Sequence, residues 1–185
     1  QSPHPKTLRR MKRGYGAQEV ERCFQRLSKY PECFIGMDVI TGFPGETDED
    51  FQESVKMLSD LPWTRLHVFP YSERRGTPAL RLKGSVAVDV RKERARILMD
   101  LSLSRQRQWT APFVGRVLDQ VLFEAPARGP DGSHEWKSGY SRNYVRVLAR
   151  GGEGICSVRV TDALVDPVRQ DVTVIGVPVS VPVKE

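Results

Sequence analysis

The sequence predicts an α/β portion followed by a small antiparallel β-barrel. An apolar, β-branched run ends at Gly42 in a Gly-Phe-Pro-Gly turn, and an amphipathic helix pattern follows directly. From Val114 onward, short β-rich runs separated by Gly and Pro turn signals replace this pattern. We therefore expect two domains, residues 1–110 and 111–185.

The α/β portion shows alternating helix and strand patterns. Apolar spacing predicts helices over residues 6–12, 17–30, 50–61 and 89–110, and strands over 34–41 and 65–71. Thr47, with Asp50 three residues later, is a near capping box, which predicts a helix start after the glycine turn. A strand–helix–strand order predicts parallel strands, and α/β proteins bind ligands where such strands end.

The second portion has strand patterns at residues 117–124, 144–149, 155–161 and 171–177, and we expect an extended tail over 177–185. Small barrels of this kind bind nucleic acid through a basic face that carries aromatic side chains. Six residues could supply that face: Trp136, Tyr140, Arg142, Asn143, Tyr144 and Arg146. The alternative is that Trp136 and Tyr144 belong to the core.

Charge and cysteine content narrow the class of protein. The net charge of +6 lies in residues 1–110, with 20 basic and 14 acidic residues, whereas residues 111–185 carry nine of each. This excess is typical of nucleic-acid binding or of a solvated mixed surface. No apolar run approaches the roughly 20 residues that span a bilayer. Three scattered cysteines predict a reducing, cytoplasmic location, with Cys23 and Cys33 as buried hydrophobic residues.

Four segments resemble, in order, the radical S-adenosylmethionine (SAM) methylthiotransferases. They are Leu-Arg-Arg-Met-Lys-Arg-Gly-Tyr (8–15), Asp-Val-Ile-Thr-Gly-Phe-Pro-Gly-Glu-Thr (38–47, with Asp50-Phe51), Leu-His-Val-Phe-Pro-Tyr-Ser-Glu-Arg-Arg-Gly-Thr-Pro-Ala (66–79) and Gly-Tyr-Ser-Arg-Asn-Tyr-Val-Arg-Val (139–147). The third segment is most similar to the MtaB branch. The resemblance implies the C-terminal part of a radical SAM partial TIM barrel, followed by an RNA-binding TRAM domain.

The resemblance also implies an activity: addition of a methylthio group to C2 of N6-threonylcarbamoyladenosine beside the anticodon of tRNA. The implied cofactors are SAM and [4Fe–4S] clusters. The family's C-x-x-x-C-x-x-C loop is absent, and Gln1-Ser2 resembles the middle of its Leu-Gln-Ser-Gly stretch. We therefore expect a C-terminal part of a longer enzyme that is inactive alone, with no catalytic residue or metal ligand of its own. The alternatives are a RimO-like enzyme acting on a ribosomal protein and a non-enzymatic RNA-binding module.

Site residues follow from the same resemblance and from the predicted strand ends. The cofactor-binding candidates are Gln1, Ser2, Asp38, Ile40, Gly42, Phe69 and Tyr71. The RNA-binding candidates are Arg9, Arg10, Lys12, Arg13, Arg74, Arg75, Tyr140, Arg142, Tyr144 and Arg146. We expect Glu46 to brace the glycine turn, and the arginines of helix 89–110, including Arg91 and Arg94, to form a charged side. His67 is either a structural strand residue or an acid/base group.

Overall fold

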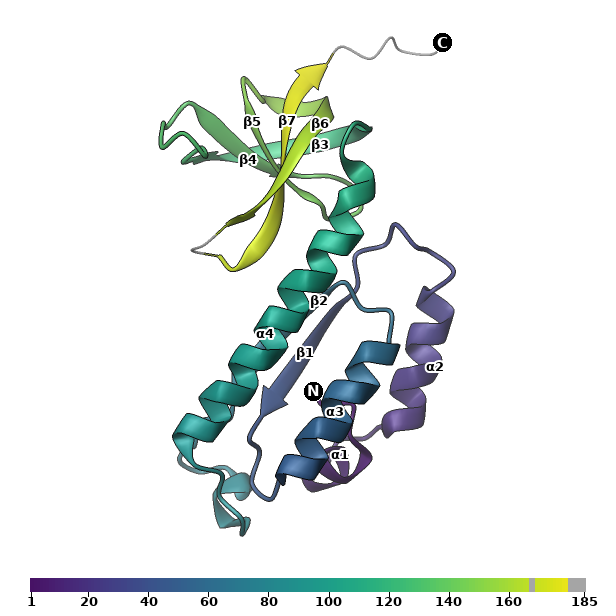
Figure 1. Ribbon diagram of the computed structural model, residues 1–185, viewed down its shortest axis with the longest axis vertical. Coiled ribbons are helices and arrows are strands. Elements are labelled where there is room, and N and C mark those ends of the chain that lie inside the picture. The colour runs from purple at the N-terminus through teal and green to yellow at the C-terminus, as the bar shows by residue number, and fades with distance from the viewer. Residues whose placement is uncertain (167–168, 180–185) are drawn as a thin grey trace. The chain divides into compact units, whose positions relative to one another are not determined.

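The computed structural model describes residues 1–166 and 169–179, which form two compact units (Figure 1). The α/β unit comprises Gln1–Pro31 and Ile35–Ser102. The barrel unit comprises Glu32–Phe34 and the chain from Leu103 onward. Of the expected extended tail, residues 177–179 belong to the last strand, and residues 180–185 lie outside the described part.

The α/β unit has the predicted order of elements. They are α1 (Pro5–Arg10), α2 (Ala17–Leu27), β1 (Gly36–Thr41), α3 (Asp48–Asp60), β2 (Arg65–Pro70), the 3-10 helix η1 (Pro78–Arg81) and α4 (Val88–Thr110) as far as Ser102. Strands β1 and β2 are parallel, in a register that runs from Gly36 opposite Arg65 to Thr41 opposite Pro70. The α/β prediction and the parallel pairing are therefore confirmed.

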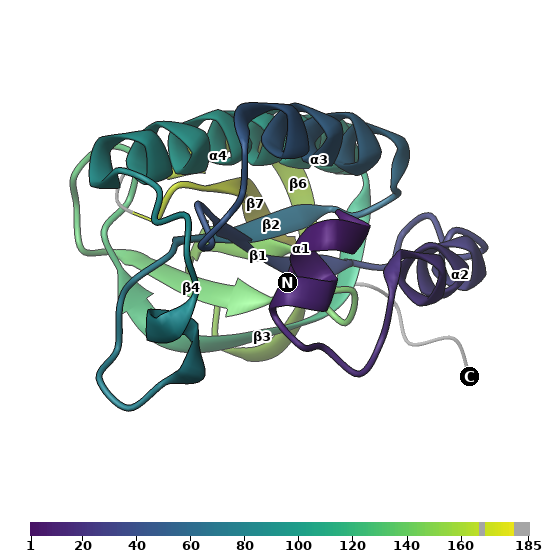
Figure 2. The same ribbon diagram turned by 90° about the horizontal axis from the view of Figure 1, so that it is seen from below.

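One face of the β1–β2 pair is covered by helices. Side chains alternate between the two faces of a strand, and Met37, Val39 and Thr41 are the buried set of β1. Met37 and Val39 pack in an apolar cluster with Phe24 of α2, Phe51 and Leu58 of α3, Trp63, Leu66 of β2 and Leu98 of α4. Figure 2 shows α3 and α4 running side by side along the sheet. The residues that alternate with the buried ones therefore lie on the opposite face of the two strands.

Helix α3 begins at the capping box that the sequence predicts. The Thr47 hydroxyl accepts a hydrogen bond from the Asp50 N–H at 3.1 Å, and the Asp50 carboxylate accepts one from the Thr47 N–H at 3.1 Å. Lys6 of α1 also donates to both oxygens of Asp50, at 2.8 and 2.9 Å. Burial alone would raise the pKa of Asp50, but these hydrogen bonds bring it below its ordinary value. The cap therefore fixes the direction in which the chain leaves the glycine turn.

The barrel unit is a closed five-stranded barrel with strand order β3-β4-β5-β7-β6. Its strands are β3 (Val117–Ala127), β4 (Trp136–Tyr140), β5 (Arg146–Arg150), β6 (Gly154–Asp166) and β7 (Asp171–Val179), after the short 3-10 helix η2 (Ala111–Phe113). The predicted barrel is confirmed with two corrections. Strands β5 and β7 pair in parallel, and β4 was not predicted, because Trp-Lys-Ser-Gly-Tyr contains no β-branched residue.

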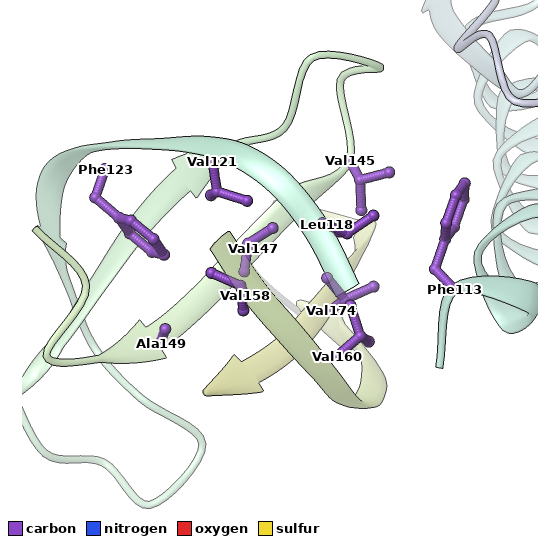
Figure 3. Close-up of a cluster of buried hydrophobic side chains, with 10 residues drawn as sticks. All are labelled: Phe113, Leu118, Val121, Phe123, Val145, Val147, Ala149, Val158, Val160 and Val174. Carbon is purple, nitrogen blue, oxygen red and sulfur yellow. The ribbon is translucent and has the colours of Figure 1, made fainter. Parts of the chain in front are cut away.

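Apolar side chains fill the barrel. Figure 3 shows ten of them: Phe113, Leu118, Val121, Phe123, Val145, Val147, Ala149, Val158, Val160 and Val174. Gly139 is required where β4 crosses β3, because a Cβ there would lie 2.3 Å from the Leu122 carbonyl oxygen. Residues that alternate along the strands with these inward-pointing side chains must face outward, and they form the outer surface of the barrel.

Among the residues described, no helix combines the length and apolar character needed to cross a membrane.

Candidate functional site

The uncovered face of the β1–β2 pair gathers several predicted cofactor residues. In the parallel register Asp38 lies opposite His67, and Ile40 lies opposite Phe69. Asp38 and His67 are exposed, Ile40 is half-buried and Phe69 is 51% exposed. This face therefore combines a carboxylate and an imidazole with an apolar pair one step nearer the carboxyl ends of the strands.

Gln1 lies along the edge of β1 that β2 does not occupy. The Ile40 N–H donates to the Gln1 carbonyl oxygen at 3.0 Å, as a neighbouring strand would. Arg13 donates to the Gln1 side-chain oxygen. An open groove of about 550 Å³ follows this edge, and its lining includes Gln1, Tyr15, Cys23, Gly36 and Asp38. Sequence reasoning missed Tyr15 and Cys23, because neither is near Gln1 or Asp38 in the chain.

Three other cofactor candidates are engaged inside the protein. Ser2 is 2% exposed, and its hydroxyl accepts a hydrogen bond from the His4 N–H at 3.1 Å. Gly42 has φ 70°, and a Cβ there would lie 2.4 Å from the Arg91 side chain. The Tyr71 ring packs edge-on against Phe43, with ring centroids 5.3 Å apart. These residues build the strand ends rather than the uncovered face.

Glu46 closes the glycine turn, residues 42–46, as predicted. One of its carboxylate oxygens accepts hydrogen bonds from the Gly42 N–H at 2.9 Å and from Arg94 at 2.6 Å. The side chains of Glu46 and Arg94 are only 4% and 6% exposed. Burial raises the pKa of Glu46, whereas Gly42 and Arg94 act to lower it. Arg94 also pairs with Asp48 at 2.6 Å, so it ties the turn to the first residue of α3.

Arg91 ties the ends of both strands to α4. Its guanidinium donates to the Tyr71 carbonyl oxygen at 3.0 Å, to the Val86 carbonyl oxygen at 2.7 Å and to the Glu73 carboxylate at 2.8 Å. The Thr41 hydroxyl donates to the Arg91 carbonyl oxygen at 3.1 Å. The expectation that Arg91 and Arg94 lie on a charged outer side of the helix was wrong, since each residue is 5% exposed.

The basic RNA-binding candidates of the α/β unit divide into free and engaged side chains. Arg9, Lys12, Arg74 and Arg75 are exposed, and Arg13 is exposed while it contacts Gln1. Arg10 instead donates to the carbonyl oxygens of Pro44 at 2.9 Å and Lys83 at 3.0 Å. Its guanidinium fills the space beside Gly45, where a Cβ would lie 2.2 Å from it. Arg10 therefore supports the glycine turn.

In the barrel unit, residues 141–145 form a tight turn between β4 and β5. The Ser141 and Val145 main chains are joined by a hydrogen bond of 3.0 Å, and the Ser141 hydroxyl accepts from the Val145 N–H at 3.0 Å. Tyr144 has φ 66°, so it lies in this turn and not in a strand as predicted. Arg142 is exposed and Tyr144 is 67% exposed, so both side chains project from the turn.

Aromatic rings and residues 32–34 support this turn from one side. The Tyr144 ring lies 5.5 Å from the Tyr140 ring and 6.2 Å from the Phe34 ring. Phe34 in turn packs edge-on against Trp109 at 5.7 Å. The Asn143 side chain donates to the Glu32 carbonyl oxygen at 3.1 Å. Two tyrosines are thus held in an orientation that leaves part of each ring open to solvent.

Two further candidates of this unit have structural partners. Arg146 donates to Asp166 at 3.1 Å and to Thr173 at 2.8 Å, and its side chain is 11% exposed. Trp136 donates to Asp131 at 3.0 Å and lies under the Arg150 guanidinium, 5.3 Å from the ring centroid. Of the predicted basic and aromatic face, Tyr140, Arg142 and Tyr144 therefore remain the accessible group.

The cysteines do not fit an iron–sulfur cluster. Cys23 and Cys33 are exposed, which corrects the expectation that both are buried, and Cys156 is half-buried in β6. Within residues 1–166 and 169–179, no three His, Cys, Asp or Glu side chains group to hold a metal ion. An iron–sulfur cluster therefore finds no ligand set among the described residues.

Comparison with known proteins identifies relatives for most of the chain. Residues 1–58 match the family model of the radical SAM superfamily. The threonylcarbamoyladenosine tRNA methylthiotransferase MtaB of Bacillus subtilis is 34% identical over 154 residues, which cover 83% of this chain and 34% of the relative. The tRNA-2-methylthio-N(6)-dimethylallyladenosine synthase of Thermobifida fusca is 35% identical over 156 residues, covering 84% and 31%.

A second MtaB, from Aquifex aeolicus, is 37% identical over 125 residues, which are 67% of this chain and 30% of the relative. The chain thus spans about a third of the length of the curated relatives it matches. The radical SAM match covers the β1 strand and the glycine turn, and both kinds of tRNA methylthiotransferase match well beyond it. The chain belongs to the radical SAM methylthiotransferase family.

Proposed function

We propose that this chain is part of a tRNA methylthiotransferase that adds a methylthio group to C2 of N6-threonylcarbamoyladenosine next to the anticodon. In this proposal the α/β unit supplies one side of the SAM site and the barrel unit, as a TRAM-like domain, contacts tRNA. The observation that carries the proposal is the uncovered face of β1 and β2, where Asp38, Ile40 and Phe69 come together at strand ends.

The residues on this face have the chemistry that SAM requires. The Asp38 carboxylate can accept hydrogen bonds from hydroxyl or ammonium groups, and Ile40 with Phe69 offers an apolar surface for an adenine ring. Gln1 contributes a side-chain amide at the same strand. SAM supplies the group-transfer and radical chemistry when it is bound, and the chain's own task is to bind and orient it.

The engaged residues around the glycine turn have a positioning role in this proposal. Arg91 holds the backbone that follows β2 and Arg94 holds the turn that follows β1, so Gly42 and the strand ends keep one geometry without contacting the ligand. Buried, fully hydrogen-bonded ion pairs restrict the backbone in this way. Ser2, Gly42 and Tyr71 therefore belong to the support of the site, while Gln1, Asp38, Ile40 and Phe69 belong to its surface.

The tRNA contact is proposed at the turn that carries Arg142 and Tyr144. An exposed guanidinium beside two partly open tyrosine rings combines phosphate attraction with base stacking. Arg9, Lys12, Arg13, Arg74 and Arg75 are further exposed cations for the phosphate backbone. Arg10 and Arg146 are left out of this contact, because their guanidinium groups already have protein partners.

The choice of threonylcarbamoyladenosine as the proposed substrate rests on the sequence of one strand. Leu-His-Val-Phe-Pro-Tyr-Ser in and after β2 favours the threonylcarbamoyladenosine branch, although relatives of both tRNA branches have nearly equal identity. A ribosomal-protein substrate and a non-enzymatic RNA-binding role are the competing functions. Deletion of the gene distinguishes the three functions, because each predicts a different change in the modified nucleosides of tRNA or in the modified ribosomal protein.

The test is mass spectrometry of tRNA nucleosides from the source organism with its complete gene deleted. We expect loss of the 2-methylthio form of N6-threonylcarbamoyladenosine, and restoration by the intact gene. A gene carrying Asp38→Ala should fail to restore it, whereas Asp60→Ala, at the exposed end of α3, should restore it. Loss of the methylthio form of dimethylallyladenosine would assign the other tRNA branch. Unchanged tRNA with an unmodified ribosomal protein would contradict the proposal.

A further inference from the structure

An apolar row crosses the outside of the barrel next to the 141–145 turn. In the antiparallel registers Leu122 of β3 lies opposite Tyr140 of β4 on one side and opposite Ile155 of β6 on the other. Val121 and Phe123, the neighbours of Leu122, point into the barrel (Figure 3). Tyr140, Leu122 and Ile155 therefore share the outer face, and we call them the outer row.

The side chains of the outer row are more exposed to solvent than is usual for apolar residues on a small barrel. Ile155 is 68% exposed and Leu122 is 42% exposed, whereas most outward positions of small barrels carry polar residues. Neighbouring strands are about 4.8 Å apart, so the row extends about 10 Å across the sheet. Contiguous exposed apolar side chains mark a contact surface more often than scattered ones do.

The charge of the outer row favours contact with the bases of a nucleic acid over contact with its phosphates. The outer row contains no Lys, Arg, Asp or Glu, and Tyr144 extends the row as a fourth member through its ring contact with Tyr140 at 5.5 Å. Arg142 projects from the adjoining turn, which places one cation at the end of an apolar surface. In duplex RNA the flat faces of the bases are stacked within the helix, whereas unpaired bases expose them.

We propose that the outer row, extended by Tyr144, is a platform for unpaired RNA bases, with Arg142 holding the adjacent phosphate. The platform selects single-stranded loops over duplex, because only unpaired bases can cover its apolar surface. Leu122 and Ile155 are then base-contacting residues that no motif in the sequence indicates. The inference rests on the proposed function, in which RNA is the ligand of the barrel unit.

The experiment measures binding of the whole chain to two synthetic RNAs with equal numbers of phosphates. One is a hairpin with an unpaired loop, and the other is a blunt duplex. We expect the Leu122→Gln/Ile155→Gln double variant to bind the hairpin at least about fivefold more weakly and the duplex unchanged. Its salt dependence should stay that of the wild type, because no phosphate contact is lost.

Two further variants separate stacking from charge. Arg142→Ala should weaken binding to both RNAs and reduce the slope of log K against log salt by about one. Val177→Gln is the matched control, since Val177 is 55% exposed on β7 but lies in register with Arg159, outside the outer row. The control should leave binding to both RNAs unchanged, and circular dichroism should show that all three proteins are folded.

The outcomes distinguish this inference from the function on which it rests. If the wild-type chain binds neither RNA, the proposed tRNA contact fails and the platform fails with it. If the wild type binds RNA but the double variant binds both RNAs as the wild type does, or loses both equally, only the platform is overturned. A change of sedimentation coefficient in the double variant without a change in hairpin binding would assign the outer row to a contact between copies of the chain.

Discussion

The two units differ in how far their buried architecture depends on arginine. In the α/β unit, Arg91 and Arg94 lie inside the protein, where they hold the ends of two strands and the glycine turn between β1 and α3. In the barrel unit the side chains of the interior cluster are apolar, Arg142 and Arg150 are exposed, and Arg146 alone of these three arginines is largely buried, where it donates to Asp166 and Thr173. The units thus obtain a defined backbone by different means.

The difference follows from what each backbone must do. Barrel strands pair with neighbours on both sides, so the ladder satisfies their main-chain groups and leaves the interior to apolar packing. The strand ends of the α/β unit leave the sheet, and their carbonyl groups need other donors. Arg91 and Arg10 supply those donors to the carbonyl oxygens of Tyr71 and Pro44. Charged side chains in this unit therefore donate hydrogen bonds to main-chain carbonyl groups that the sheet leaves without donors.

Breaking the buried pair of the α/β unit should have the largest effect. Arg94→Met leaves the Glu46 carboxylate buried without its cation, which should lower the free energy of unfolding by about 3–5 kcal/mol. Urea unfolding followed by Trp63 fluorescence measures this, with Trp109 and Trp136 replaced by Phe so that Trp63 reports alone. Trp63 is 2% exposed in the apolar cluster, so its emission follows this unit.

The double variant Glu46→Gln/Arg94→Met is the control for that result. The glutamine amide that replaces the Glu46 carboxylate keeps an oxygen that can accept the Gly42 hydrogen bond, but it carries no charge that needs a partner. We expect the double variant to recover more than half of the loss. A cost below about 1 kcal/mol for Arg94→Met alone would contradict the role given to the pair.

The second effect separates two arginines of the barrel unit that stand four residues apart. Arg146→Met removes hydrogen bonds to Asp166 and Thr173 and should cost about 1–3 kcal/mol of unfolding free energy. Arg142→Ala, on the exposed turn, should change it by no more than about 0.5 kcal/mol. Thermal and urea unfolding of the two variants measure the difference. Equal costs would show that the turn needs both side chains.

The sequence predicts elements whose determinants are local. The strand–turn–helix segment and the capping box of Thr47 and Asp50 follow from residues close together in the chain, and the parallel pairing follows from the strand–helix–strand order. The burial of Arg94 could not be predicted, because its partner Glu46 is 48 residues away and the helix pattern alone resembles a solvated face. Tyr144 was misplaced for a related reason, since its left-handed backbone depends on the hydrogen bonds of Ser141.

The residues of the candidate site also divide into those that could be predicted from the sequence and those that could not. Asp38, Ile40 and Phe69 could be assigned to one face from strand alternation and a parallel register. Their separation from Ser2, Gly42 and Tyr71 depends on the contacts that these three residues make with His4, Arg91 and Phe43 in the folded protein. The outer row has no local signature at all, because Leu122, Tyr140 and Ile155 become neighbours only when three strands pair.

The smallest effect concerns a surface carboxylate of the barrel unit, Asp131 in the β3–β4 loop. Hydrogen bonds from the Ser133 N–H and from Arg150 lower the pKa of Asp131 from 3.8 to about 2. Because the folded pKa is the lower one, the ionised group favours the ordered loop fully above pH 3.8, and this contribution is lost as the pH falls through about 2. The Trp136 indole N–H, which donates to Asp131 at 3.0 Å, reports the change directly.

An NMR titration of the Trp136 indole proton should therefore show a midpoint near pH 2, with the methyl resonances of Val147 unchanged over the same range. Asp131→Asn should abolish the titration while keeping an acceptor for the indole. A midpoint near 3.8 would mean that Asp131 is free in solution and that the loop is not held by this cluster. Movement of the Val147 resonances with the indole would instead assign the transition to the apolar barrel. The charged surface and the packed interior of this unit would then not be independent, contrary to the contrast between the two units.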